Sequence, residues 1–214
     1  MVQSYVLDDP RPIAASAPYT YFLPSAARLA AIEPGDQVKL LFRSLAASPK
    51  YDVERMWVCV LAVDGEHFEG TLENAPFDMP GLKKGERVSF ERFHVVSIDF
   101  QDAAKEDRIG DEPGRQYWDR CMVDRCVLYE GVPVGYLYRE DDLLEREGDK
   151  YPDSGWRIRG DARGLSDAEV DSREAEYVAL GTVLNRDDSW LPLIDEPKGS
   201  AFLRNFTTNT YDKQ

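Results

Sequence analysis

The stretch 54–74, ERMWVCVLAVDGEHFEGTLEN, decides the fold of the first half of the chain. Its first part alternates with a period of two, as an extended strand does. One face of that strand carries Trp57, Cys59, Leu61 and Val63. Asp64-Gly65 supplies a tight turn, and Phe68 opens the return strand. The stretch therefore predicts a β-hairpin.

Shorter strand patterns lie on both sides of this hairpin. Residues 36–44, DQVKLLFRS, alternate apolar and polar positions, and residues 80–100 contain a turn followed by a strand pair or a bent strand. Residues 21–35 favour a helix with Ser25 as its N-cap. Many short strands around one short helix predict a curled, barrel-like sheet over residues 1–100.

The composition then changes. Residues 101–116, QDAAKEDRIGDEPGRQ, are polar and rich in turn formers, which is typical of a linker. A second module follows at residues 117–214. No alternation of strands and long helices, and no repeat of 20–50 residues, is visible. We therefore predict an α+β protein with two small, mainly antiparallel β modules and a few short helices.

Within the second module, residues 121–141 read as another hairpin, with its turn at Glu130-Gly131. Residues 165–188 read as helical at least in part. Ser166 followed by Glu169 matches a capping box. Four apolar positions downstream have helical spacing, namely Tyr177, Leu180, Val183 and Leu184.

The charge is uneven along the chain. The net charge is −14, and residues 1–100 carry 14 acidic and 10 basic residues, which leaves −10 for residues 101–214. Such a field repels nucleic-acid phosphates and anionic lipid, and it attracts basic partners. Neither nucleic acid nor a membrane is therefore an expected partner.

The compartment is predicted from three features. No apolar run approaches the roughly 20 residues that cross a bilayer. The start, MVQSYVLDDPRP, lacks the basic and apolar regions of a signal peptide. Three cysteines leave one thiol unpaired in any pairing, which argues against a secreted disulfide scaffold. We expect a cytoplasmic protein with reduced thiols.

The common catalytic constellations are missing from the sequence. His67 and His94 are isolated in sequence; we expect His67 to be solvated and His94 to occupy a strand. Cys121 and Cys126 lie too far apart along a strand to chelate together, at roughly 3.3 Å per residue, so buried thiols are expected. No phosphate-binding glycine loop occurs. The sequence predicts no catalytic residue, no metal site and no cofactor.

Residues 153–161, DSGWRIRGD, contain an aromatic residue between two turn signals. They belong to a region where acidic residues alternate with aromatic ones, which suits a protein interface. These aromatic residues are Tyr136, Tyr138, Tyr151, Trp156, Tyr177 and Trp190. The alternative is that the rings form the core, because four of them lie in apolar-patterned segments. Trp156 and Trp190 lie beside turns, so these two are the first candidates for exceptions.

The second half resembles a known bacterial family. The pattern comprises VGYLYRE at 134–140, DSGW at 153–156, a Gly-Asp corner, a Leu-Asn-x-Asp segment and a closing GSAFLR at 199–204. The family has no known biochemical activity and is classed among the immunity proteins of polymorphic toxin systems. Residues 162–176, ARGLSDAEVDSREAE, are longer than the corresponding stretch of the pattern.

The first half resembles a second bacterial family of unknown function. The resemblance rests on GDQVKLLF at 35–42, ERMWV at 54–58 and GLKKGERVSF at 81–90. Neither resemblance implies a catalytic residue.

Together these observations favour a non-catalytic, immunity-like protein that binds and occludes a basic toxin. The predicted contact residues are Asp153, Trp156, Asp161, Asp187 and Trp190. For the DSGW stretch, the favoured prediction is a structural turn whose Trp156 covers the core or a groove, with Asp153 and Ser154 fixing the turn. Contact with a partner is the alternative for this stretch. An adaptor or ligand-binding protein, or a small hydrolase that uses carboxylates and a cation, remains an alternative. The oligomeric state is left open.

Overall fold

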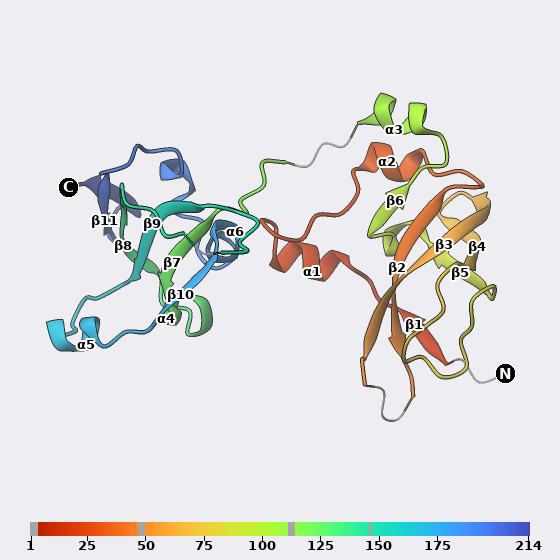
Figure 1. Ribbon diagram of the computed structural model, residues 1–214, viewed down its shortest axis with the longest axis horizontal. Helices are drawn as coiled ribbons and strands as arrows, with labels where there is room; N and C mark the ends of the chain where they lie inside the picture. The colour runs from red at the N-terminus through yellow and green to blue at the C-terminus, as the bar shows by residue number, and fades with distance from the viewer. Residues whose placement is uncertain (1–3, 47–49, 111–113, 146) are drawn as a thin grey trace. The chain divides into compact units, whose positions relative to one another are not determined.

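The computed structural model describes residues 4–46, 50–110, 114–145 and 147–214 (Figure 1). The chain forms two compact units, the first being Met1–Ser16 with Tyr21–Gly114 and the second Ala17–Thr20 with Arg115–Gln214. The predicted α+β class, with two antiparallel-rich sheets and few short helices, is confirmed. In the described parts of the chain, no helix is both long and apolar enough to span a membrane.

The first unit is built on a six-stranded, barrel-like sheet. Its strands follow the order β1-β2-β3-β4-β5. Strand β6 pairs with the first residues of β2, which β1 does not reach. The elements are β1 (Tyr5–Leu7), α1 (Arg11–Ser16), α2 (Ala26–Ala30), β2 (Gln37–Ser44), β3 (Val53–Asp64), β4 (His67–Leu72), β5 (Arg87–Glu91), the 3-10 helix η1 (Arg92–His94), β6 (Ser97–Asp99) and α3 (Ala103–Ile109). Ser25 caps α2, as predicted, by accepting a hydrogen bond from the Arg28 amide.

The hairpin predicted at 54–74 is confirmed as β3 and β4, and Asp64 pairs with His67 across its turn. The buried face of β3 is the one opposite to the face that carries Trp57, Cys59, Leu61 and Val63. Met56, Val58 and Val60 lie in the core, whereas Leu61 and Val63 are exposed. Both faces of β3 are apolar in sequence, so the pattern alone could not choose between them. The pairing register with β2 determines which face is buried, because it places Val58 and Met56 beside buried residues of β2.

Helix α3 falls inside the stretch predicted as a linker. Asp102 caps the helix, and Lys105 is buried against the first unit. The Lys105 Nζ atom lies 2.8 Å from Asp36 Oδ2 and 3.0 Å from Glu33 Oε1. Burial works to lower the pKa of Lys105, but these two carboxylates outweigh burial and raise the pKa. The helix is thus part of the first unit, and the module limits at residues 100 and 117 stay a prediction.

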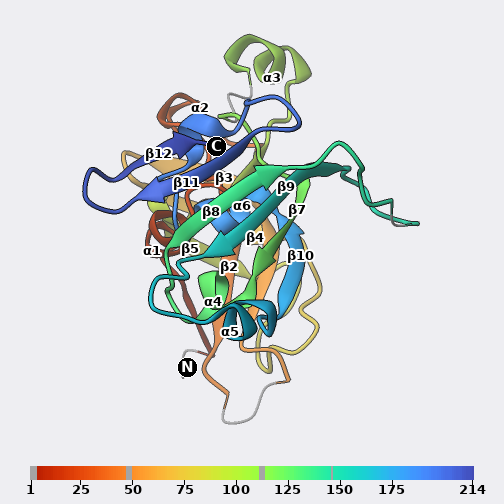
Figure 2. The same cartoon turned by 90° about the vertical axis from the view of Figure 1, so that its left-hand side faces the viewer.

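The second unit contains a six-stranded mixed sheet. The strand order is β10-β7-β9-β8-β11-β12, and β7 and β9 run parallel (Figure 2). The elements are β7 (Arg120–Asp124), α4 (Arg125–Tyr129), β8 (Val134–Arg139), β9 (Asp153–Gly160), α5 (Asp167–Asp171), β10 (Ala175–Ala179), α6 (Leu180–Leu184), the 3-10 helix η2 (Leu191–Leu193), β11 (Ala201–Asn205) and β12 (Thr210–Lys213). Residues of α4 and α6 share one core with β9.

The hairpin predicted at 121–141 is wrong. The two strands β7 and β8 exist, but α4 connects them and β9 lies between them. The apolar run Cys126–Tyr129 carries no period that separates a strand from a helical turn. It forms α4 because Val127 and Leu128 are buried there against the core.

The region 165–188 is helical only in part. The capping box of Ser166 and Glu169 is confirmed and begins α5. Tyr177 lies in strand β10, and the helical positions Leu180, Val183 and Leu184 belong to the separate helix α6. One helical pattern in the sequence therefore corresponds to two short helices with a strand between them in the structure.

A short segment from the beginning of the chain completes the second unit. The Tyr19 ring packs against the core, and its hydroxyl donates to Asp188 at 2.8 Å. Asn185 accepts from the Tyr19 amide at 2.9 Å and donates to the Thr20 hydroxyl at 2.7 Å. A Cβ atom on Gly181 would lie 2.6 Å from the Tyr19 carbonyl oxygen, so glycine permits this close approach. Residues 17–20 are thus structural members of the second unit.

We expect Tyr19→Ala to lower the free energy of unfolding of the second unit by about 2 kcal/mol, because a partly buried ring and its hydrogen bond are lost. Tyr129→Ala is the matched control. Tyr129 also donates to a carboxylate at 2.8 Å but is 63% exposed. Urea unfolding followed by fluorescence measures both. Equal losses in the two variants would show that the segment does not support the unit.

Candidate functional site

Strand β9 is the DSGWRIRG stretch, and it begins with a fixed turn. Gly155 has a φ of +82°, and a Cβ atom there would lie 2.6 Å from the Glu140 carbonyl oxygen. The Asp153 carboxylate accepts hydrogen bonds from the Gly155 amide at 3.1 Å and the Leu144 amide at 2.8 Å. The glycine and the carboxylate together set the direction in which the strand leaves the turn.

A buried ion pair holds this turn to the strand. Arg157 NH2 lies 2.8 Å from Asp153 Oδ2, and Arg157 Nε lies 2.6 Å from Glu140 Oε2. Burial works to raise the pKa of Asp153, but the hydrogen bonds from Arg157 and the two amides outweigh it and lower the pKa. The carboxylate therefore stays ionised and compensates a guanidinium that is itself buried.

Trp156 and Trp190 are core residues. Each has 0% of its surface exposed. Their rings meet at 5.8 Å between centroids, and Trp156 Nε1 donates to the Ile194 carbonyl at 3.3 Å. The structural turn predicted for DSGW, with Trp156 on the core, is confirmed. Trp190 also stays in the core, although its position beside a turn made it a candidate to leave it. Their role in partner binding stays a prediction, and direct contact would require the core to open.

The two other predicted contact residues are half-buried and engaged within the unit. Asp161 pairs with Arg163 at 2.7 Å, and hydrogen bonding from that guanidinium lowers the pKa of Asp161. Asp187 accepts from the Val134 amide at 2.8 Å and pairs with Arg204 at 2.7 Å. The structure thus brings Trp156 and Trp190 together, but it does not gather the five predicted residues on one surface. Their contact role remains untested.

The face of the sheet opposite the core carries a different set of residues, which we term the open face. Cross-strand pairing aligns them in two rows. The first row is Tyr177, Met122, Arg157, Tyr138 and Ala201, and the second is Arg159, Tyr136 and Leu203. Figure 2 views the sheet from this side, with α4 and α6 behind it. Tyrosine and arginine are the residue types that most often anchor protein interfaces.

A hollow of about 450 Å³ opens on this face. Its lining comprises Gly135, Tyr136, Tyr138, Arg159, Gly160, Asp161, Ala162, Arg163, Val170, Leu203, Arg204 and Phe206. The Arg163 guanidinium lies 3.6 Å above the centre of the Phe206 ring. Arg159 pairs with the buried Asp124 at 2.9 Å. The walls are thus mostly apolar, and the arginines among them have carboxylate partners.

Sequence reasoning missed most of this hollow. It singled out Tyr136, Tyr138 and Asp161, but not Arg159, Leu203 or Phe206. The alternation in RIRG at 157–160 and YLY at 136–138 was a usable signal. It places Ile158 and Leu137 on the core side and their neighbours on the other.

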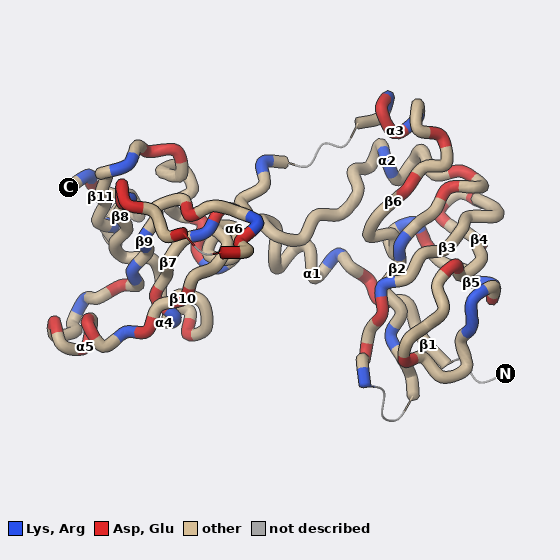
Figure 3. Tube along the Cα trace, viewed as in Figure 1, with Lys and Arg blue, Asp and Glu red and all other residues tan. Residues whose placement is uncertain are grey.

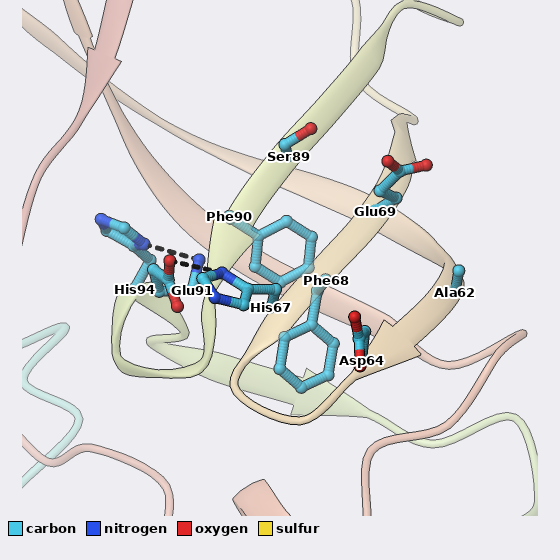
Figure 4. A pocket seen from close by; sticks show the side chains of 9 residues that line it. All are labelled: Ala62, Asp64, His67, Phe68, Glu69, Ser89, Phe90, Glu91 and His94. Carbon is cyan, nitrogen blue, oxygen red and sulfur yellow. Dashed lines mark hydrogen bonds and ion pairs between the residues drawn. The ribbon is translucent and has the colours of Figure 1, made fainter.

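A second hollow, of about 600 Å³, lies on the first unit (Figure 4). Glu91 contacts both of its histidines, which are isolated in sequence, and His67 is solvent-exposed as predicted. His67 Nδ1 lies 2.6 Å from Glu91 Oε1, and the Glu91 amide donates to His94 Nδ1 at 3.0 Å. His94 lies in η1 rather than in a strand, and burial lowers its pKa.

This histidine pair has a structural explanation. Glu91 and His94 form a capping box at the N-terminus of η1, and His67 is exposed beside it. Within the ranges that the structure describes, no group of three or more His, Cys, Asp or Glu side chains could hold a metal ion. Cys121 is buried and Cys126 half-buried, and burial raises the pKa of both thiols.

We expect Asp153→Asn to lower the free energy of unfolding by about 3 kcal/mol at neutral pH, because it leaves Arg157 buried without its full charge partner. The pKa of Asp153 is lowered by folding, so its contribution is present above its unfolded value of about 3.9 and is lost as pH falls. The difference between variant and wild type should therefore shrink below about pH 4.

Asp195→Asn is the control for this measurement. Asp195 also pairs with an arginine, Arg115 at 2.5 Å, but its side chain is 71% exposed. Solvent screens such a pair, so we expect no resolvable loss. Urea unfolding at several pH values tests both variants, and similar losses at neutral pH would contradict the role given to burial.

Comparisons with known proteins match two families, and the boundary between the units at Gly114 and Arg115 falls in the gap between the two matches. Residues 17–108 match the family model described as "Uncharacterized protein conserved in bacteria (DUF2314)". No curated protein and no solved structure matches the chain. Residues 121–213, which include β7 to β12 and the open face, match the family model described as "Immunity protein Imm33 domain", and this match supports an immunity-like role for the second unit.

Proposed function

We propose that this protein neutralises a cognate bacterial toxin by binding it through the open face of the second unit and occluding the toxin's working surface. The supporting observation is the location of the open face within the residues that match the Imm33 immunity protein domain. In this proposal the protein acts as a non-catalytic inhibitor in the cytoplasm of the bacterium that makes the toxin.

The composition of the open face supports a binding role. Its tyrosines and Leu203 offer apolar area beside arginines whose positions are fixed by carboxylates. Rigid side chains lose little conformational entropy when they are buried, so such a surface binds at low cost. The hollow adds a recess of about 450 Å³ into which a partner side chain can insert.

The charge of the chain supports a basic partner. The net charge is −14, and most of it lies in residues 101–214. Opposite charge speeds the encounter of two proteins and disfavours wrong partners. A toxin with a basic substrate cleft, such as a nuclease, fits this field. Nucleic acid and membranes are not proposed as partners.

The two alternatives predict different behaviour. A hydrolase that needs a cation gains stability when calcium, magnesium or manganese binds its native state. An adaptor or ligand-binding protein leaves the cell's resistance to toxins unchanged. No described feature favours either alternative over the immunity role.

We expect co-expression of this protein to restore growth to a bacterial host that expresses the toxin encoded beside its gene. The purified pair should form a complex at low salt that weakens at high salt, because ions screen the attraction between exposed charges. A catalytically inactive toxin variant gives the material for the binding measurement. Failure of protection together with failure to form the complex would refute the immunity role.

A further inference from the structure

The hollow and its surroundings indicate which chemical groups a toxin would present to the open face. This inference rests on the proposed function. We infer that the open face binds a basic protein segment that inserts one aromatic side chain into the hollow. Lysine or arginine residues on both sides of that side chain reach two acidic segments that flank the face. Three observations support this inference.

The first observation is the construction of the hollow. Leu203, Tyr136 and Phe206 give it apolar walls, and the central carbon of the Arg163 guanidinium lies over the Phe206 ring, 3.6 Å from its centre. A planar cation stacked on a ring extends the flat wall against which a further aromatic ring packs. The volume of about 450 Å³ is ample for a single indole or phenol side chain.

The second observation is the placement of charge around the face. Residues 140–150 join β8 to β9, and residues 161–176 follow the opposite end of β9. Each segment contains six acidic and two basic residues. The exposed acidic residues of the two segments are Asp141, Asp142, Glu145, Glu147, Asp149, Asp167, Glu169, Asp171 and Glu174. Figure 3 marks acidic residues in red, and these segments bring negative charge to both ends of β9.

The third observation is that carboxylates neutralise the arginines that lie on the open face between these two segments. Arg159 and Arg173 share the single buried carboxylate of Asp124, and Arg163 pairs with Asp161. Arg157 contacts two carboxylates, those of Asp153 and Glu140, so four arginines meet four carboxylates. These arginines are therefore not free to attract an acidic partner. The excess of negative charge lies in the segments at the two ends of the face, which favours a basic partner segment over an acidic one.

The test uses the full-length chain and three pentapeptide amides. The probe has one tryptophan between two pairs of lysines, the second peptide replaces tryptophan with alanine, and the third replaces the lysines with glutamates. Amide chemical shifts of the isotope-labelled protein are followed by NMR during titration. The probe should shift amides at 134–138, 159–163 and 201–206, with an affinity that falls as salt rises.

Two peptide results would overturn the inference. One is equal binding of the alanine peptide, which would show charge attraction without an anchor. The other is equal or tighter binding of the glutamate peptide, which would show that the arginines recognise an anion. Shifts confined to other parts of the chain would also place the anchor site elsewhere and overturn it.

A pair of matched variants separates the hollow from general surface effects. Leu203 is 51% exposed on β11, and Leu61 is 42% exposed on β3 of the first unit. Leu203→Asn should weaken probe binding about tenfold, whereas Leu61→Asn should leave it unchanged. Ala162→Trp fills the hollow from an exposed position and should abolish binding with an unchanged melting temperature. Wild-type affinity in both hollow variants would overturn the inference.

The inference and the proposed function fail separately. Peptide binding at the hollow without protection against the toxin would refute the immunity role and leave the aromatic anchor site standing. Protection by the Leu203→Asn and Ala162→Trp variants at wild-type toxin doses would keep the immunity role and refute the hollow as its anchor site.

Discussion

The buried pair of Asp153 and Arg157 is the interaction on which the second unit depends. It holds a turn that only glycine can make at position 155, and the turn starts the strand that lies between β7 and β8. The alternation of β9 then sets Trp156 and Ile158 into the core and leaves Arg157 and Arg159 on the other face. One strand therefore organises both the core and the surface that we propose for binding.

The pair of Asp153 and Arg157 also affects how much positive charge the open face presents to a partner. A buried guanidinium is stable only when its charge is compensated, and Asp153 and Glu140 do so here. Arg159 and Arg173 share the one carboxylate of Asp124, so the second carboxylate at Arg157 balances the charge of these three arginines. The open face is consequently a rigid surface of tyrosines and neutralised arginines. The negative charge that dominates the composition is displaced to the segments at both ends of β9.

Local features were predictable from the sequence because their causes are local. The β3–β4 hairpin, the Ser25 cap and the capping box of Ser166 and Glu169 each depend on a few neighbouring residues. Strand order was not predictable in the same way. The insertion of β9 between β7 and β8 is decided by contacts between distant residues, and no periodicity within 121–141 encodes it.

The immunity-like resemblance of the second half was predictable from the sequence, but the arrangement of the candidate residues was not. Resemblance and charge indicated a binding surface, whereas the exposure of Trp156 and Trp190 depends on what packs over their turns. The two histidines approach each other because β4 pairs with β5, a pairing that lies outside any single motif. The alternating pattern alone places Tyr136 and Tyr138 on one face of the strand and Leu137 on the other. The sequence does not show which of the two faces the helices cover.

Hydrogen exchange of the protein with and without its bound toxin tests the central claim most directly. The account predicts slowed amide exchange in Val134–Arg139 and Ala201–Asn205, the strands that carry Tyr136 and Leu203 on the open face. It also predicts unchanged exchange in α6, on the opposite side of the sheet. Protection of α6 and η2 with unchanged exchange in β8 and β11 would contradict the account.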